Sequence, residues 1–269
     1  MAMIGGAIGY RLLKRISPIG DGSSMDGSAY LDKSKLETLL GPTIWDDIAD
    51  QVVIDFGCGE GAEAIEMARR GARRVIGVDI QERLIRAARK RAIAEGVSER
   101  CVFAQETTER ADVITALDSF EHFDDPPLIL QRMSQLLRPM GCVLAAFGPT
   151  WYHPLGGHLF SVFPWAHLIF SEKALIRWRS DFKADGAMSF REVAGGLNQM
   201  TIHRFERIVE QSPFRFAEFD AVPIRKLKFL SNKLTREFTT AIVRCKLVLR
   251  EGICAALAVS LSPADAHVM

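Results

Sequence analysis

The sequence predicts an α/β protein built on a doubly wound, mostly parallel sheet. Three observations lead to this prediction. Short runs of β-branched residues alternate with helix-forming segments across residues 52–147. A glycine-rich turn, residues 57–61, joins the first such run to its helix, and an aspartate closes each of the first two runs, at Asp55 and Asp79. In open parallel sheets, ligands bind at the carboxyl ends of the strands, so we expect the functional residues there.

The N-terminal part, residues 1–45, is expected to form a helical segment followed by a loop. It begins MAMIGGAIGYRLLKRI, in which the apolar residues precede the basic ones, the reverse of a secretory signal. We interpret this segment as a docked terminal helix, and the alternative is a basic amphipathic helix that touches a membrane surface. Residues 16–28 are rich in glycine and serine and predict a mobile loop. A helix is predicted for residues 33–40, where Gly41 and Pro42 end it.

The expected core, residues 46–147, supplies five strands and three helices in regular alternation. Strands are predicted at 52–56, 75–79, 101–105, 113–117 and 142–147, and helices at 62–70, 82–95 and 128–137. The residues Arg138, Pro139, Met140 and Gly141 predict a turn before the fifth strand, because proline and glycine prevent the helix from continuing.

The glycine turn does not favour a phosphate-bearing ligand. Gly57, Gly59 and Gly61 read G-x-G-x-G, whereas the dinucleotide fingerprint reads G-x-G-x-x-G. Glu60 also puts a negative charge where a pyrophosphate would have to lie. The pattern favours a nucleoside that carries a cation instead of phosphates, with Asp55 available to the positive group.

Residues 148–200 interrupt the alternation after the fifth strand. Nine of the chain's 23 aromatic residues lie between Trp151 and Phe190, which predicts an aromatic-rich insertion. Three histidines of this insertion, His153, His158 and His167, lack the spacing of a metal motif, so we predict no metal site. Residues 201–250 predict a helix at 202–211 and strands at 214–222 and 241–249 that form an antiparallel edge. The tail, residues 251–269, carries no clear pattern.

The length of 269 residues indicates one domain. The net charge is +1 and 25% of the residues are charged, so the overall charge does not indicate a polyanion as partner. Five cysteines are scattered and never form a C-x-x-C pair, which indicates neither disulfides nor zinc and favours the cytoplasm. No apolar run reaches the roughly 20 residues that span a bilayer, so no transmembrane segment is expected. The basic stretch 225–250 is interpreted as a solvated face, with RNA or anionic lipid as the alternative partner.

Three segments carry a resemblance to a known family: VVIDFGCGEG, VIGVDI and DVITALDSFEHFDDPPLILQRMSQLLRPMG. Together with the strand that follows, they resemble the class I S-adenosylmethionine-dependent methyltransferases, especially the branch that includes ubiquinone and menaquinone biosynthesis methyltransferases. The resemblance implies a Rossmann-like, seven-stranded sheet, a single methyltransferase domain and S-adenosylmethionine as cofactor, with S-adenosylhomocysteine as product. The cofactor-binding residues it implies are Asp55, Gly57, Cys58, Gly59, Gly61, Asp79, Ile80, Glu106 and Asp118. Among these, Asp79 is expected to bind the ribose.

Methyl transfer to a hydroxyl or an acidic carbon calls for a general base within hydrogen-bonding reach. His122, just beyond the fourth strand, is our candidate, and the alternative is a structural histidine that caps the loop. The insertion is expected to form a lid over the acceptor, with Tyr152 and His158 orienting its polar group; the alternative is a small hydrophobic core. The predicted activity is methylation of an oxygen, nitrogen or carbon of a small, largely apolar or aromatic metabolite. The rivals are an RNA methyltransferase that uses residues 225–250 and a non-catalytic cofactor-binding regulatory protein.

Overall fold

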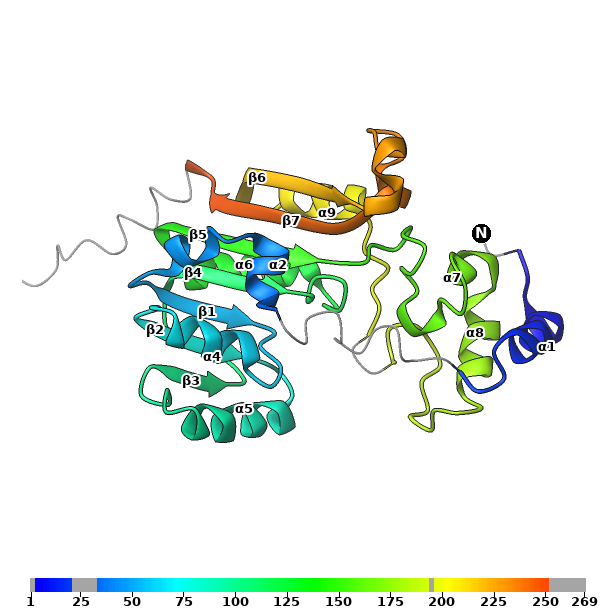
Figure 1. Ribbon diagram of the computed structural model, residues 1–269, viewed down its shortest axis with the longest axis horizontal. Helices are drawn as coiled ribbons and strands as arrows, with labels where there is room; N and C mark the ends of the chain where they lie inside the picture. The colour runs from blue at the N-terminus through cyan, green and yellow to red at the C-terminus, as the bar shows by residue number, and fades with distance from the viewer. Residues whose placement is uncertain (1–2, 21–32, 194–195, 252–269) are drawn as a thin grey trace, which may run out of the picture.

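A seven-stranded sheet in the order β3-β2-β1-β4-β5-β7-β6 forms the centre of the computed structural model (Figure 1). The structure describes residues 3–20, 33–193 and 196–251; most of the predicted loop at 16–28, and the tail beyond residue 251, lie outside them. The strands are β1 (Val52–Phe56), β2 (Arg74–Val78), β3 (Cys101–Ala104), β4 (Ala111–Leu117), β5 (Leu137–Phe147), β6 (Phe214–Pro223) and β7 (Thr240–Leu249). The first five pair in parallel, and β7 pairs antiparallel to both β5 and β6. The predicted sheet and its antiparallel edge are confirmed.

Helices cover both faces of the sheet, and each face has its own hydrophobic core. Because side chains alternate across a strand, Val53 of β1 faces one core and Ile54 faces the other. The Val53 side is covered by α2 (Lys35–Leu40), α3 (Ile44–Ile48), α4 (Ala62–Arg69) and α5 (Glu82–Ala94). The Ile54 side is covered by α6 (Pro126–Leu136) and α9 (Ile202–Glu210). The sequence did not predict α3.

The predicted turn at residues 138–141 is wrong, because the structure places these residues within β5. Ala111 of β4 pairs with Leu137, and Val113 pairs with Cys142, so the residues between them form a bulge rather than a separate turn. The Arg138 guanidinium binds the Asp112 carboxylate at 2.6 Å. Proline and glycine do stop α6, but the backbone that follows is extended, and it pairs with β4 again from Cys142 onward.

The insertion folds into a lobe at the carboxyl ends of the parallel strands (Figure 1). It contains η3 (His158–Phe160), α7 (Ala166–Ile169) and α8 (Glu172–Arg179), and the N-terminal helix α1 (Gly6–Ile16) packs against α8. Leu13 of α1 joins four buried aromatic side chains of the insertion in a third hydrophobic cluster, which we call the lobe core: Phe160, Phe170, Trp178 and Phe190. These four aromatics therefore agree with the alternative interpretation, a small hydrophobic core.

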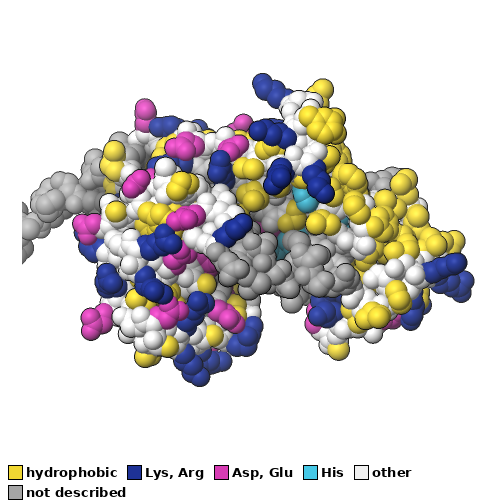
Figure 2. Space-filling view, viewed as in Figure 1, with side chains coloured by type: hydrophobic (Ala, Val, Ile, Leu, Met, Phe, Trp, Pro, Cys, Tyr) yellow, Lys and Arg dark blue, Asp and Glu magenta, His cyan; other side chains and the backbone are white. Residues whose placement is uncertain are grey.

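Between β6 and β7 the chain forms η4 (Arg225–Leu230) and α10 (Arg236–Thr239), which project at the same end as the lobe. The basic stretch 225–250 is accordingly divided between this projection and the sheet. Three of its cations are held in ion pairs: Arg236 with Glu206, Arg244 with Asp220 and Lys246 with Asp47. On the face shown in Figure 2, charges of both signs mix over the sheet, whereas hydrophobic side chains gather at the lobe end.

Candidate active site

The strand order reverses between β1 and β4, and the glycine turn follows β1 at that point. Gly57, Gly59 and Gly61 all have left-handed backbones, with φ of 84°, 53° and 78°. A Cβ atom on Gly57 would lie 2.7 Å from the Ser119 hydroxyl oxygen, whereas one on Gly59 would meet nothing within 4 Å. The turn therefore needs glycine conformations, and at Gly59 it presents bare backbone to open space.

Asp79, which follows β2, is fixed against the glycine turn. One carboxylate oxygen accepts a hydrogen bond from the Gly59 amide at 3.1 Å, and the other accepts one from the Gln81 amide at 2.8 Å. The neighbouring Ile80 side chain is 84% exposed, an apolar surface at the same edge of the sheet. Glu106 lies exposed just beyond β3, which pairs with β2. These three side chains follow adjacent strands, as the sequence predicted.

Asp55 is a buried carboxylate at the end of β1. Its Oδ1 accepts a hydrogen bond from the Thr115 hydroxyl at 3.0 Å, and its Oδ2 has no hydrogen-bond partner among the described residues. Burial raises the pKa of Asp55 to about 7, the Glu63 carboxylate adds to the rise, and Thr115 and Lys35 oppose it. Cys58, in the same turn, is also buried, and burial raises the pKa of its thiol. A buried carboxylate oxygen without a partner favours a cation beside it.

Lys35, at the start of α2, reaches this acidic edge from the N-terminal part of the chain. Its ammonium lies 3.0 Å from Asp118 Oδ2 and 3.8 Å from Glu63 Oε1. Asp118 follows β4 and has a left-handed backbone, with φ of 47°. Lys35 is not among the predicted site residues, since nothing in the sequence of a surface helix indicates that its first residue meets the end of β4.

Glu121 is a second buried acid and is not among the predicted site residues. Its Oε1 accepts a hydrogen bond from the Gly148 amide at 3.1 Å, and its Oε2 has no partner among the described residues. Burial, together with the nearby Asp118 carboxylate, raises the pKa of Glu121 to about 8. The available signal was its position: a charged residue in the apolar FEHF segment directly after a strand.

The structure brings two of the three predicted catalytic residues together. The rings of His122 and His158 lie 5.3 Å apart between centroids. His122 Nδ1 lies 2.6 Å from the Gly196 carbonyl oxygen, which can only accept, so Nδ1 carries a proton and Nε2 is the nitrogen that accepts in the neutral ring. Burial and the nearby His122 lower the pKa of His158 to about 3, so this ring is neutral. Tyr152, by contrast, is 36% exposed and packs on Phe238 of α10.

The loop that carries His122 is held by the end of the insertion. Asn198 donates from its side-chain amide to the carbonyl oxygens of Phe120 and Phe123, at 2.6 and 2.8 Å, and its backbone amide donates to the Glu121 carbonyl at 3.0 Å. Asn198 is buried and was not among the predicted site residues. Its hydrogen bonds link the position of His122 to the position of the lobe.

The two other histidines of the insertion have structural partners. His167 donates from Nε2 to the Trp151 carbonyl at 2.6 Å, and His153 Nδ1 accepts from the Leu155 amide at 2.9 Å. Burial lowers the pKa of each ring to about 4. Within residues 3–20, 33–193 and 196–251, no group of three or more histidine, cysteine, aspartate or glutamate residues is arranged to hold a metal ion.

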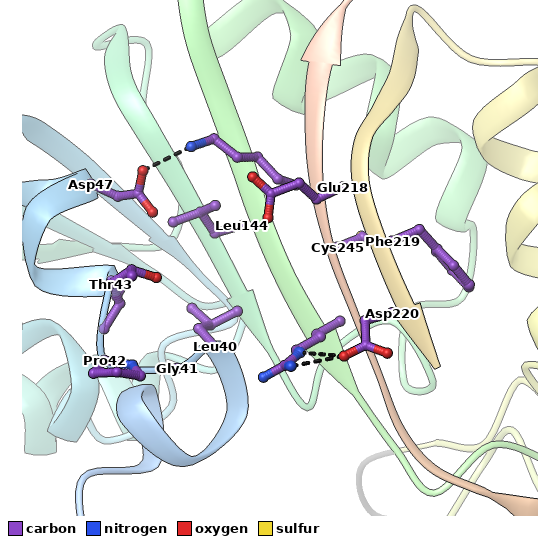
Figure 3. A pocket seen from close by; sticks show the side chains of 13 residues that line it. Leu40, Gly41, Pro42, Thr43, Asp47, Leu144, Glu218, Phe219, Asp220 and Cys245 are labelled. Atoms are coloured by element: carbon purple, nitrogen blue, oxygen red, sulfur yellow. Dashed lines mark hydrogen bonds and ion pairs between the residues drawn. The ribbon is translucent and has the colours of Figure 1, made fainter. Parts of the chain in front are cut away.

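A cavity of about 430 Å³ lies elsewhere, between α2, α3 and the strands β5 to β7 (Figure 3). Four of its five charged lining residues form ion pairs with one another: Lys246 reaches Asp47 at 2.8 Å, and Arg244 reaches Asp220 at the same distance. None of the residues of the glycine turn lines it. We therefore assign the candidate site to the carboxyl ends of β1, β2 and β4.

The site has a glycine turn where the strand order reverses, an aspartate after β2 and two buried acids. This combination is typical of α/β proteins that bind a nucleoside with a positive charge and no phosphates. The methyltransferase domain family matches residues 28–215, and the chain belongs to this family. The predicted resemblance to class I S-adenosylmethionine-dependent methyltransferases is thereby confirmed.

Among known proteins, the chain is similar to ubiquinone biosynthesis O-methyltransferases. It is 40% identical to that of Leptothrix cholodnii over 98 residues, 34% of this chain and 41% of the relative. It is 35% identical to that of Neisseria meningitidis over 104 residues, 36% of this chain and 44% of the relative. The alignments thus span less than half the length of these two relatives.

Solved structures share the fold at low identity. A putative S-adenosylmethionine-dependent methyltransferase from Listeria monocytogenes aligns with a TM-score of 0.51 at 14% identity, over 76% of this chain and 93% of that one. The magnesium protoporphyrin IX methyltransferase of Synechocystis, solved with bound S-adenosylmethionine, aligns with a TM-score of 0.50 at 16% identity, over 91% and 92%.

Proposed function

We propose that this chain transfers the methyl group of S-adenosylmethionine to an oxygen of a small, largely apolar or aromatic metabolite. The observation that carries the proposal is the acidic, glycine-lined edge at the ends of β1, β2 and β4, where Asp55 keeps a buried oxygen without a partner. The choice of oxygen as acceptor atom rests on the similarity to ubiquinone biosynthesis O-methyltransferases.

The residues at this edge suit each part of the cofactor. Asp79 can accept the ribose hydroxyls while it keeps its hydrogen bond from Gly59, and the exposed Ile80 offers an apolar surface for the adenine. Asp55 and Asp118 attract the ammonium and sulfonium groups, and Lys35 attracts the carboxylate. Once bound, S-adenosylmethionine supplies a methyl group that is already activated by the positive sulfur.

The protein's remaining task is to align the acceptor and take its proton. We assign His122 Nε2 as the atom that accepts the proton of the acceptor hydroxyl, because Nδ1 is engaged in the hydrogen bond to the Gly196 carbonyl. The acceptor oxygen gains the methyl group and loses its proton to this nitrogen. Alignment of well-held reactants is worth on the order of 7 kcal/mol or more, and a general base contributes about a hundredfold to ten-thousandfold. His158, neutral and next to His122, is assigned to orienting the acceptor.

The lobe lies at the carboxyl ends of the parallel strands, beside the candidate site, which supports its role as a lid. We also propose a cytoplasmic location. In the part of the chain that the structure describes, no helix is both long and apolar enough to cross a bilayer.

Calorimetry with S-adenosylmethionine, S-adenosylhomocysteine and NAD tests the cofactor assignment. We expect binding of the first two, since no anion cradle is formed by the glycine turn, and binding of NAD alone would refute the proposal. The acceptor is then sought by incubating the protein and cofactor with metabolite extracts and detecting products heavier by one methyl group. Cofactor binding without any product would favour the regulatory alternative.

The RNA methyltransferase alternative is tested separately by filter binding across salt concentrations. Phosphate contacts produce a steep loss of affinity with salt. Three of the eight basic residues of this stretch are held in ion pairs with acids, which lowers the positive charge available to RNA.

A further inference from the structure

Helix α1 exposes a stripe of large apolar side chains. Its buried face, with Gly9 and Leu13, packs against the insertion. The adjoining face of the helix carries Ile8, Leu12 and Ile16, which are 69%, 40% and 51% exposed. Residues four apart lie above one another on a helix, so these three form one continuous ridge. Met3 and Ile19, beyond the two ends of the helix, are 79% and 83% exposed.

The segment between β6 and β7 exposes a second apolar surface. Phe229 is 82% exposed and Leu234 is 91% exposed, with Leu230 and Phe238 at 48% and 44%. A soluble surface rarely leaves phenylalanine and leucine this bare in a short segment. We call the stripe on α1 and these four side chains together the apolar edge.

Positive charge surrounds both parts of the apolar edge. Residues 3–20 contain three basic residues and no acid, and residues 224–236 contain five basic residues and no acid. Most of these basic side chains form no ion pair with an acid among the described residues. They are two of the three on α1 and four of the five in residues 224–236: Arg11, Arg15, Arg225, Lys226, Lys228 and Lys233. Lys14 pairs with Asp181, and Arg236 pairs with Glu206.

The two parts lie at the same end of the molecule. Figure 1 places η4, α10 and α1 beyond the carboxyl ends of the parallel strands, and Figure 2 shows hydrophobic side chains running from one part to the other along this end, with Lys and Arg at its margins. The ring of Tyr152, in the insertion, packs on Phe238 of α10 with 5.2 Å between centroids, and α1 packs on α8 of the same insertion.

We propose that the apolar edge docks on the surface of an anionic lipid bilayer. Exposed isoleucine, leucine and phenylalanine enter the boundary between headgroups and acyl chains, and the surrounding Arg and Lys side chains attract the anionic headgroups. RNA would use the cations but would leave Ile8, Phe229 and Leu234 without a role. Docking in this orientation turns the lobe and the carboxyl ends of the strands towards the bilayer, so that an apolar acceptor reaches the site from the lipid.

Vesicle flotation tests this proposal with no cofactor or acceptor present, so its outcome is independent of the methyl-transfer proposal. Wild-type protein is mixed with vesicles of phosphatidylcholine alone or of phosphatidylcholine with phosphatidylglycerol. We expect binding to the anionic vesicles, weaker binding to the neutral ones and a loss of binding as salt is raised. Absence of binding to the anionic vesicles, or binding that phosphatidylglycerol does not increase, would overturn the proposal.

Two double variants locate the contact. Ile8→Ser with Leu12→Ser, and Phe229→Ser with Leu234→Ser, should each weaken vesicle affinity about tenfold or more, because they remove apolar groups that enter the bilayer. The matched control is Ile93→Ser with Met140→Ser, which alters side chains 68% and 93% exposed outside the apolar edge, near the end of α5 and in the bulge of β5. Circular dichroism confirms that each variant is folded. An equal loss in the control, or RNA binding that persists where vesicle binding is absent, would contradict the assignment.

Discussion

Asp55 should make cofactor binding depend on pH. Its pKa is about 7 in the protein without ligand, so part of the population is protonated at neutral pH. A cation beside Oδ2 favours the carboxylate, and binding below pH 7 must therefore release a proton. We expect the affinity for S-adenosylmethionine to fall by up to about tenfold for each pH unit below 7, and to level off above it. Calorimetry in buffers of different ionisation enthalpy measures both effects.

Asp55→Asn is the companion variant to that titration. The amide keeps the size of the side chain but carries no charge, so affinity should be weaker than wild type above pH 7 and should lose most of its pH dependence. A wild-type affinity that stays constant through this range would show that the cofactor's charge does not lie near Asp55.

His122 should affect turnover and leave cofactor binding unchanged. In His122→Ala the proton acceptor is removed, whereas the cofactor residues of β1, β2 and β4 are untouched, so kcat should fall about a hundredfold or more. The control is His203→Ala, an exposed histidine on α9 that makes no contact with the site. Unchanged turnover in His122→Ala would favour the alternative stated from the sequence, a structural histidine that caps the loop.

The glycine turn between β1 and α4 offers a matched pair of variants. Gly59→Ala and Gly61→Ala both impose a left-handed backbone on alanine, at about 1–2 kcal/mol each. Only Gly61→Ala also collides, because its Cβ would lie 2.6 Å from the Phe103 ring and 2.9 Å from Ala88 Cβ, whereas a Cβ on Gly59 faces open space. Thermal unfolding should therefore show the larger loss of stability for Gly61→Ala.

Cofactor affinity should distinguish the same two variants in the opposite order, with the weaker binding in Gly59→Ala. Gly59→Ala places a methyl group where the backbone is presented to the ligand. The affinity of this variant for S-adenosylmethionine should therefore fall even though its loss of folding stability is the smaller of the two. Equal stability for the two variants would contradict the packing of Gly61 against Phe103, and normal affinity in Gly59→Ala would exclude a close approach of the ligand to this backbone.

At the level of elements, the sequence predicted what local chemistry determines. Single short segments show the β-branched run of β1, the glycine spacing and the aspartate after β2. The sheet follows from them, and so does the edge at which we propose that the cofactor binds. The bulge at Arg138 was missed because its extended backbone depends on pairing with β4 and on the Asp112 carboxylate. Lys35, Glu121 and Asn198 were missed because their roles arise only when distant segments meet at the end of β4.

At the level of the whole molecule, three hydrophobic clusters divide the chain into a sheet with two cores and a lobe with its own core. The candidate site lies where these parts meet: the residues that we propose bind the cofactor are anchored in the sheet, and the loop with His122 is tied by Asn198 to the lobe. Cofactor binding and acceptor binding should therefore respond separately to changes in the two parts.

Leu13→Ala tests this separation, because Leu13 is fully buried in the lobe core and contacts neither sheet core. Truncation of a buried leucine costs about 2–5 kcal/mol, and a cluster this small should open locally rather than unfold the whole chain. Hydrogen exchange should accelerate in α1 and α8 and stay unchanged in β1 and β4. The KM for the acceptor should rise, while the Kd of S-adenosylmethionine stays the same.

Ile48→Ala is the control for Leu13→Ala, since Ile48 is equally buried but belongs to a sheet core. There the same kind of cavity should accelerate exchange in β1 and its neighbours, because α3 packs on the sheet. Faster exchange in the sheet for both variants would mean that lobe and sheet unfold as one cooperative unit. In that case the lobe could not open over the site while the cofactor remained bound, and its role as a lid would have to be abandoned.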